Sequence, residues 1–262
     1  MRATPQHYIL LMTACIRPSE TNIHRHAIWR NDPEVRLNDY KTALEFWLRY
    51  PDQRISGIVF VENSGYDLGD LKDLVRRRNP FGRQTEFLQI AATAIPEGLH
   101  YGYSEAEMID HAFTDSRLVA ACSHVVKVTG RIFFPDLSRL LNRVRDHHLI
   151  VTDCRDFRLF HIRRQMILTT LFIVRKDFYL DSLYDAKQMM ISTRTGLIEW
   201  MYYRILRPLH RARPRDMVLR FPFNVEPVGF GAHWNIDYGS RKKKLIATAR
   251  GISRLLFPAL WI

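Results

Sequence analysis

The sequence lacks several features that would assign a protein to a class at once. No stretch approaches the roughly 20 consecutive apolar residues that a membrane-spanning helix requires. There are no internal repeats and no low-complexity segment. The three cysteines, Cys15, Cys122 and Cys154, are odd in number and widely spaced, which suits neither a disulfide framework nor a zinc site. We therefore expect neither a helical membrane domain nor a disulfide-rich secreted one, and the cysteines favour a reducing cytoplasm.

The chain of 262 residues has ample apolar material for a large core. Hydrophobic residues make up 47% of it and aromatic residues 12%, which argues against disorder. Strand-like apolar runs alternate with helix-like segments, which is typical of a βαβ sheet. We expect strands at 8–16, 58–61, 85–92, 124–128, 148–152 and 167–174, and helices at 38–48, 68–78, 104–113, 135–144, 196–206 and 241–257. The predicted fold class is therefore α/β, with a mostly parallel sheet flanked by helices.

Two of these helices have recognisable start signals. Asn38 is placed to cap the helix that follows it, because asparagine side chains accept hydrogen bonds from free backbone N–H groups. Ser104 and Glu107 have the spacing of a capping box. We expect both helices to begin at these residues.

The net charge of +12 is high and is concentrated late in the chain. From Tyr202 onward there are twelve basic residues and three acidic ones, so +9 of the total lies in this part. A cationic end of this kind predicts an anionic surface as partner, either lipid or nucleic acid.

Three polar segments follow strand-like runs or precede helices, where α/β folds bind ligands. The segment Glu62–Gly65 follows an apolar strand, Gly98–Glu107 leads into a helix, and Lys127–Arg131, with sequence KVTGR, joins a strand to a helix. A glycine loop before a helix offers N–H donors to an anion, and the planar fork of arginine suits phosphate. Each segment also has a purely structural interpretation, as a turn, a capped helix start or a pair of cations bound to nearby acids.

Together these segments resemble the nucleotide-sugar-dependent glycosyltransferases of bacterial surface-polysaccharide synthesis, whose fold is GT-A-like, or Rossmann-like. The resemblance covers the order of segments over most of the chain. Gly98–Glu107 is similar to a Gly-Lys-Gly-Tyr-Gly-Glu loop of these enzymes, with Leu99 at the lysine position and Tyr103-Ser104 inserted before the acid. The resemblance implies a nucleotide-sugar donor and a glycan or lipid-linked acceptor.

The resemblance also implies roles for individual residues. Lys127 and Arg131 lie where many GT-A enzymes have an Asp-x-Asp metal motif, and they can stabilise the leaving diphosphate without metal. Glu199, in an apolar helical segment that favours a raised pKa, is the candidate general base of an inverting transfer, although pairing with Arg194 or Arg204 is as compatible. The candidate donor-binding residues are Glu62, Asn63, Gly65, Tyr101, Gly102, Thr129, Gly130 and Asp153.

No metal ligand is predicted. Asp153 and Asp156 follow a strand, but acids in such positions more often pair with arginines such as Arg155 or Arg158. The histidines at 24 and 26 have no convergent acid or cysteine near them, and solvent-exposed or core positions are favoured for them and for the pair at 147 and 148. Without a clear Asp-x-Asp, a divalent metal is not indicated, and metal dependence stays open.

The end of the chain predicts a separate role. We expect a catalytic unit at 1–207 and a basic extension at 208–262, ending in a helix with Leu245, Ala249, Ile252 and Leu256 on one face. With Phe257, Leu260, Trp261 and Ile262 beyond it, this helix favours a peripheral position on an anionic membrane, at the inner face of the cell membrane. A helix packed on the body is the alternative. Rival functions are a nucleic-acid-binding or nuclease-like protein, although we expect no nucleic acid partner, and a non-catalytic membrane module.

Overall fold

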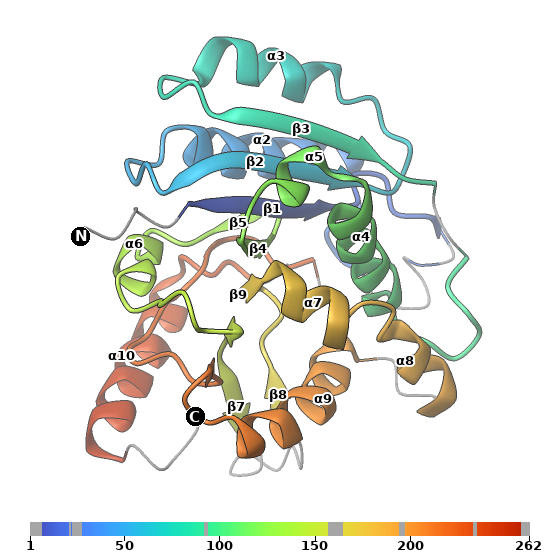
Figure 1. Cartoon of the computed structure of the whole chain (residues 1–262). Helices are drawn as coiled ribbons and strands as arrows, with labels where there is room; N and C mark the ends of the chain where they lie inside the picture. The colour runs from blue at the N-terminus through green and yellow to red at the C-terminus, as the bar shows by residue number, and fades with distance from the viewer. Residues whose placement is uncertain are drawn as a thin grey trace.

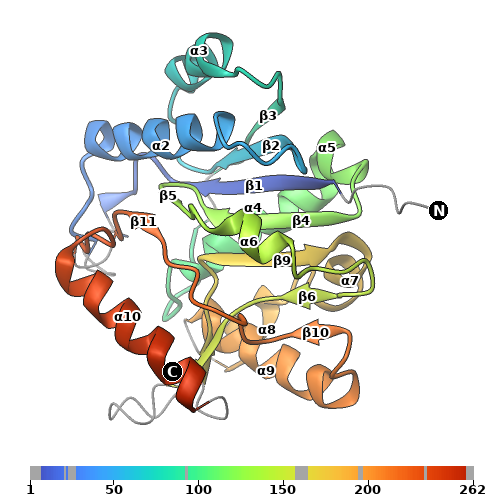
Figure 2. The ribbon, with the colours of Figure 1, turned by 90° about the vertical axis from the view of Figure 1, so that its left-hand side faces the viewer.

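The computed structural model describes residues 7–20, 22, 28–91, 94–156, 165–193, 197–232 and 235–257. Its centre is a seven-stranded sheet in the order β10-β6-β9-β4-β1-β2-β3 (Figures 1 and 2). The strands of this sheet are β1 (Tyr8–Ala14), β2 (Ile55–Glu62), β3 (Gln84–Gln89), β4 (His124–Thr129), β6 (Ile150–Val151), β9 (Leu171–Arg175) and β10 (Met217–Val218). All neighbours pair in parallel except β9, which is antiparallel to both β4 and β6. The predicted mostly parallel α/β sheet is confirmed.

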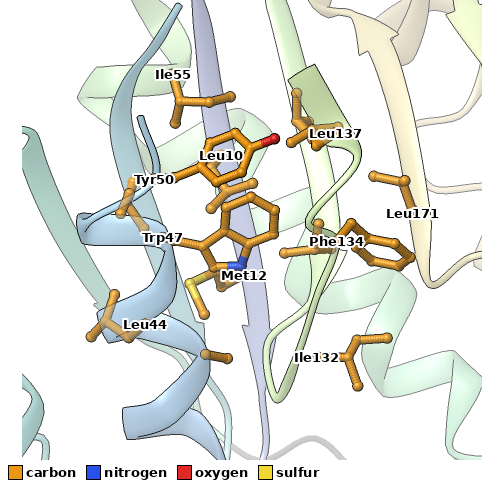
Figure 3. Packing of buried hydrophobic residues seen from close by; sticks show 14 of the residues in the cluster. Leu10, Met12, Leu44, Trp47, Tyr50, Ile55, Ile132, Phe134, Leu137 and Leu171 are labelled. Carbon is orange, nitrogen blue, oxygen red and sulfur yellow. The ribbon is translucent and has the colours of Figure 1, made fainter. Parts of the chain in front are cut away.

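Helices cover both faces of the sheet, because its central strands are apolar on both sides. On β1, Leu10 and Met12 face a core formed with α2 (Pro33–Leu48), α3 (Gly69–Arg78) and α6 (Leu137–Leu141) (Figure 3). Ile9 and Leu11 face the other core, formed with α4 (Gly102–Asp115), α5 (Arg117–Ala120), α7 (Lys176–Ser182), α8 (Lys187–Thr193) and α9 (Ile198–Ala212). The continuous apolar run at the start of the chain therefore forms a central strand.

Two predicted helix starts are wrong. Helix α2 begins at Pro33, where Asp32 accepts hydrogen bonds from the N–H groups of Glu34 and Val35, so Asn38 lies inside the helix. Proline suits the first helical position because its missing N–H needs no partner there. Helix α4 begins at Gly102 and has no side-chain cap, so Ser104 does not start it.

The last part of the chain returns to the body of the protein. The predicted boundary after residue 207 falls inside α9, and β10 beyond it joins the central sheet beside β6. Small pairs of strands complete the fold, β5 (Ile132–Phe133) with β11 (Val228–Gly229) and β7 (Cys154–Asp156) with β8 (Gln165–Ile167). Helix α10 (Arg241–Leu256) lies at the end of the molecule opposite α3 in both views (Figures 1 and 2).

Helix α10 contacts the body through basic residues and exposes its apolar ones. Arg254 is buried and binds Asp153 at 2.6 and 2.8 Å, and Arg250 pairs with Glu226 at 2.8 Å. The predicted apolar face is instead exposed to solvent, with Leu245 at 73% and Ile252 at 54% of their full exposure. The helix is thus held to the body by its cations. Residues 258–262, predicted to extend this surface, lie outside the described residues.

None of the helices in the described ranges is long and apolar enough to cross a membrane. The three cysteines are free thiols.

Candidate functional site

A pocket opens at the carboxyl ends of the parallel strands β1, β2 and β4, and we call it the strand-end pocket. It contains about 640 Å³ of space, counting the part open to solvent. Ligands of open α/β sheets bind at this edge, because the loops that leave the strands diverge there. The residues that line it include Thr13, Asn63, Tyr101, Glu105, Thr129 and Arg131.

Four of the predicted site residues meet in this pocket: Asn63, Tyr101, Thr129 and Arg131. Asn63 is 7% exposed, and among the described residues its side-chain oxygen has no hydrogen-bond partner. A buried acceptor without a partner is costly, so a ligand that donates a hydrogen bond there would be stabilised. Arg131 donates from Nε to the carbonyl of Phe230 at 2.9 Å and keeps its charge at any working pH.

Glu105 accepts hydrogen bonds from three polar side chains at the strand ends. Its Oε1 accepts hydrogen bonds from Lys127 Nζ at 2.5 Å, Thr13 Oγ1 at 3.2 Å and Thr129 Oγ1 at 3.4 Å. Helix α4 thus supplies the acid, and strands β1 and β4 supply the donors. This network ties the helix to the strands that form the pocket floor.

Thr169 connects this hydrogen-bond network to Glu199, which lies in the first turn of α9. The carbonyl of Thr169 accepts from Lys127 Nζ at 2.6 Å, and its hydroxyl donates to Glu199 Oε1 at 3.5 Å. Arg204, an alternative partner for Glu199, lies over the Trp200 ring at 4.6 Å, and Arg194 lies outside the described residues. Glu199 is therefore linked through Thr169 to Lys127 and Glu105, and we call these three charged side chains the strand-end cluster.

The two carboxylates of this cluster have opposite pKa shifts. Desolvation raises the pKa of Glu199 to about 6, and the negative charge of Glu105 adds to the rise. Burial would also raise the pKa of Glu105, but the adjacent Lys127 charge and hydrogen bond outweigh it, so this pKa is lowered. The expected raised pKa of Glu199 is confirmed. A carboxylate with a pKa near neutrality beside one that stays ionised is an arrangement suited to proton transfer.

Lys127 lies behind the pocket. Its side chain is 0% exposed, and its ammonium group donates to Glu105 and to the Thr169 carbonyl and lies 5.9 Å from the centre of the Phe172 ring. The strand explains this, since Lys127 lies in the interior of β4 and its side chain faces α4. The predicted contact between Lys127 and a leaving diphosphate therefore has no support in the geometry, and Lys127 instead holds Glu105 and neutralises its charge.

Glu62 was predicted to bind the nucleotide-sugar donor, yet its carboxylate accepts hydrogen bonds from the loops around it. It is fully buried and accepts from the N–H groups of Ile16 at 3.1 Å, Ser64 at 2.9 Å and Tyr66 at 3.3 Å, as well as from the Ser64 hydroxyl. These bonds join the loop after β1 to the loop after β2. Glu62 thus shapes the pocket wall.

The three predicted glycines serve the backbone. Gly65 has a φ of +68°, which favours glycine, and a Cβ on it would meet nothing within 4 Å. A Cβ on Gly102 would lie 3.0 Å from the Ile198 side chain, so this glycine lets α4 pack against α9. A Cβ on Gly130 would lie 2.7 Å from the carbonyl oxygen of Thr13, to which the Gly130 N–H donates at 2.9 Å.

We predict that Gly130→Ala lowers the free energy of unfolding by about 1–3 kcal/mol, the usual cost of overpacking, because the ends of β1 and β4 must separate. Urea denaturation measures this. Gly69→Ala is the control, since its added methyl group meets only the exposed Asp67 carboxylate. Equal stability of the two variants would contradict the tight approach.

Asp153 is engaged away from the strand-end pocket. It is 1% exposed, binds Arg254 at 2.6 Å and Arg155 at 2.9 Å, and accepts from the N–H of Phe221 at 3.2 Å. The predicted donor contact has no support here, because these partners occupy both oxygens. The alternative of pairing with arginines holds for Arg155. Arg158 lies outside the described residues.

Sequence reasoning missed several residues of the site. Glu105 is the acid that follows Gly102 in the segment Gly98–Glu107, so the resemblance to a glycine loop ending in an acid contained the signal. Arg36 and Tyr40 also line the pocket and bind Cys15, whose carbonyl accepts from Arg36 Nε at 2.8 Å and whose N–H donates to the Tyr40 hydroxyl at 3.0 Å. Nothing local in the sequence pointed to them.

Within the described part of the chain, no three His, Cys, Asp or Glu side chains gather as a metal site. The histidines at 24 and 26 lie outside that part. His147 and His148 pack ring against ring, with centroids 4.6 Å apart.

Searches against known proteins find likeness only at the level of structure: no protein-family profile matches the sequence, and no curated protein is similar to it. Many solved structures resemble it, and three of them serve as examples. A 4-diphosphocytidyl-2C-methyl-D-erythritol synthase from Anaerococcus prevotii has 11% identity and a TM-score of 0.44, over 93% of this chain and 96% of that one. Mouse xyloside xylosyltransferase 1 has 11% identity and a TM-score of 0.43, over 84% and 86%. A Desulfovibrio desulfuricans protein described as a nucleotide-diphospho-sugar transferase has 14% identity and a TM-score of 0.43, over 95% and 98%.

These neighbours are named for nucleotidyl transfer and for glycosyl transfer. At such identities and TM-scores they carry no argument about the activity of this protein.

Proposed function

We propose that this protein is a glycosyltransferase that moves a sugar from a nucleotide-sugar donor to a polysaccharide or lipid-linked glycan. The observation that carries the proposal is the strand-end pocket, where the unpaired oxygen of Asn63 and the guanidinium of Arg131 line one space. A nucleoside diphosphate has groups that can bind both side chains. Its base or ribose donates hydrogen bonds, and its phosphates accept them from arginine in a planar, bidentate geometry.

The proposed reaction is a direct displacement that inverts the anomeric carbon. Glu199 takes the proton of the acceptor hydroxyl, the acceptor oxygen bonds to the anomeric carbon, and the bond from that carbon to the diphosphate breaks. Arg131 stabilises the negative charge that develops on the departing nucleoside diphosphate. Lys127 acts as a positioning residue through Glu105, to which it is bound at 2.5 Å.

Nucleotide binding provides the first test. We expect nucleoside diphosphates to raise the melting temperature, and Asn63→Leu to weaken their binding about 2-fold to 10-fold, the net value of one hydrogen bond. Thermal-shift and calorimetric titrations over a panel of nucleoside diphosphates and their sugar conjugates measure this. Asn142→Leu, at an exposed position after α6, is the control. A panel with no binder, or oligonucleotides that bind more tightly, would contradict the proposal.

We further propose that the enzyme works at the inner face of the cell membrane, held there by α10 on an anionic leaflet. The outward face of α10 carries exposed Leu245, Ile252 and Leu255. Arg241, Lys242 and Lys244, at the start of the helix, are exposed beside this face. An exposed apolar stripe with basic residues next to it is suited to a surface whose interior is apolar and whose headgroups are anionic.

The double variant Leu245→Glu/Ile252→Glu is expected to weaken sedimentation with anionic liposomes about tenfold or more, because each side chain loses the gain from leaving water. Both residues are exposed, so the fold should persist. The matched control is Leu180→Glu/Ile191→Glu, two exposed apolar residues on α7 and α8. If both double variants sediment like the wild type, α10 does not bind lipid.

A further inference from the structure

A second pocket lies between α10 and the body of the protein, and we call it the α10 pocket. It contains about 770 Å³ of space, counting the part open to solvent. Its polar lining includes Arg155, Thr170, Glu226, Tyr238, Lys243 and Arg250. None of the described residues that line the strand-end pocket lines the α10 pocket.

The α10 pocket and its surroundings carry more positive than negative charge. Asp153 is shared by two cations, Arg155 at 2.9 Å and Arg254 at 2.6 Å. Glu226 pairs with Arg250 at 2.8 Å. Lys243 makes no ion pair with any described residue, although its side chain lines the pocket and is partly buried.

This excess charge is unfavourable in the protein alone. Burial lowers the pKa of Arg250, and the charges of Arg155 and Arg254 lower it further, against the opposing effect of Glu226. The pKa of Arg220 is also lowered, first by burial and then by Arg254. Like charges gathered in a partly buried space repel one another, and an anion placed among them would remove that cost.

The α10 pocket also faces the proposed reaction centre through Tyr238. The Tyr238 side chain lines the α10 pocket; burial raises its pKa, and the charges of Arg131, Arg155 and Glu199 also act on it. Tyr238 and Thr170 add hydroxyl donors to the cations. A ligand in this pocket would therefore contact Tyr238, on whose side chain the charges of Arg131 and Glu199 also act.

We propose that the α10 pocket is a second anion site, which binds the phosphate or diphosphate group of a ligand through Lys243, Arg155 and Arg250. Guanidinium and ammonium groups bind phosphate by charge-assisted hydrogen bonds, which are about twice as strong as neutral ones. The assignment of this ligand as the acceptor rests on the proposed function, whereas the anion binding itself does not. The ligand is either a lipid-borne diphosphate or a small soluble phosphate compound, and both present the same group to the pocket.

The test uses pyrophosphate as the probe and the full-length protein in an Arg131→Ala background, which removes the arginine that we assign to the diphosphate in the strand-end pocket. Lys243→Gln is expected to weaken pyrophosphate binding about tenfold or more in calorimetry. Lys244→Gln, at the next residue but exposed, is the matched control and should bind like its parent. Equal affinities of the Lys243 and Lys244 variants, or no binding to the parent, would overturn the proposal.

Two further arms separate the sources and the hypotheses. Farnesyl diphosphate that binds more tightly than pyrophosphate indicates a lipid-borne ligand, and equal binding indicates a small phosphate compound; both depend on Lys243 if the site exists. Nucleoside diphosphates are titrated against Lys243→Gln with Arg131 intact. Retained nucleotide binding with lost pyrophosphate binding separates the two sites. If the wild type binds no nucleoside diphosphate but binds pyrophosphate in a Lys243-dependent way, the proposed function is contradicted and the anion site is supported.

Discussion

Arg131→Ala is expected to lower kcat/KM for sugar transfer about 10²-fold to 10³-fold while the fold persists. The reason is that a charge-stabilising donor in a partly dry site contributes about 2.7–4 kcal/mol to the transition state. Arg131, in the turn after β4, lines the strand-end pocket, whereas Lys127 of β4 is buried against Glu105. Release of the nucleoside diphosphate, followed at several donor concentrations, measures the effect.

Two comparisons sharpen this experiment. Arg131→Lys should recover part of the rate, because lysine restores the charge but not the planar fork. Arg143→Ala, at an exposed position after α6, should leave the rate unchanged. Near wild-type turnover of a folded Arg131→Ala protein would remove Arg131 from the mechanism.

Glu199→Gln is expected to slow transfer by roughly 10²-fold to 10⁴-fold and to leave donor affinity unchanged, since a positioned base contributes that much. Glutamine keeps the shape of the side chain and the acceptor for the Thr169 hydroxyl, so the α9 turn should persist. Glu45→Gln, on the solvent side of α2, is the control. A Glu199→Gln enzyme with normal turnover would leave the carboxylate a structural role.

The pH dependence gives an independent reading of Glu199. Its pKa is raised to about 6, and a base acts only when deprotonated. The wild-type rate should therefore be full above about pH 6 and fall as pH drops through that value. The residual rate of Glu199→Gln should lack this acidic limb. An unchanged limb in the variant would assign the titration to another group.

Much of the sheet and its helices could be predicted, because long apolar runs and helical periodicity are local signals. The run from Tyr8 produced β1, and the glycine-to-acid segment contained both Tyr101 and Glu105 of the pocket. Strands of two or three residues, such as β10 and β7, carry no such pattern. They depend on neighbours far away in the sequence.

The failures at the site have the same physical origin. Glu62, Lys127 and Asp153 were recognised as polar residues near strand ends, but their partners decide their role. Lys127 meets Glu105 from 22 residues away, and Asp153 meets Arg254 from 101 residues away. Burial with such partners turns a free charge into a structural bond, and no local motif records the pairing.

The measurement that tests the central claim most directly is a crystal structure of the protein with the nucleoside diphosphate that binds best. We predict that the nucleotide occupies the strand-end pocket, with its diphosphate bound to Arg131 and its base or ribose donating a hydrogen bond to the Asn63 oxygen. A nucleotide bound elsewhere, with Arg131 and Asn63 untouched, would contradict the account.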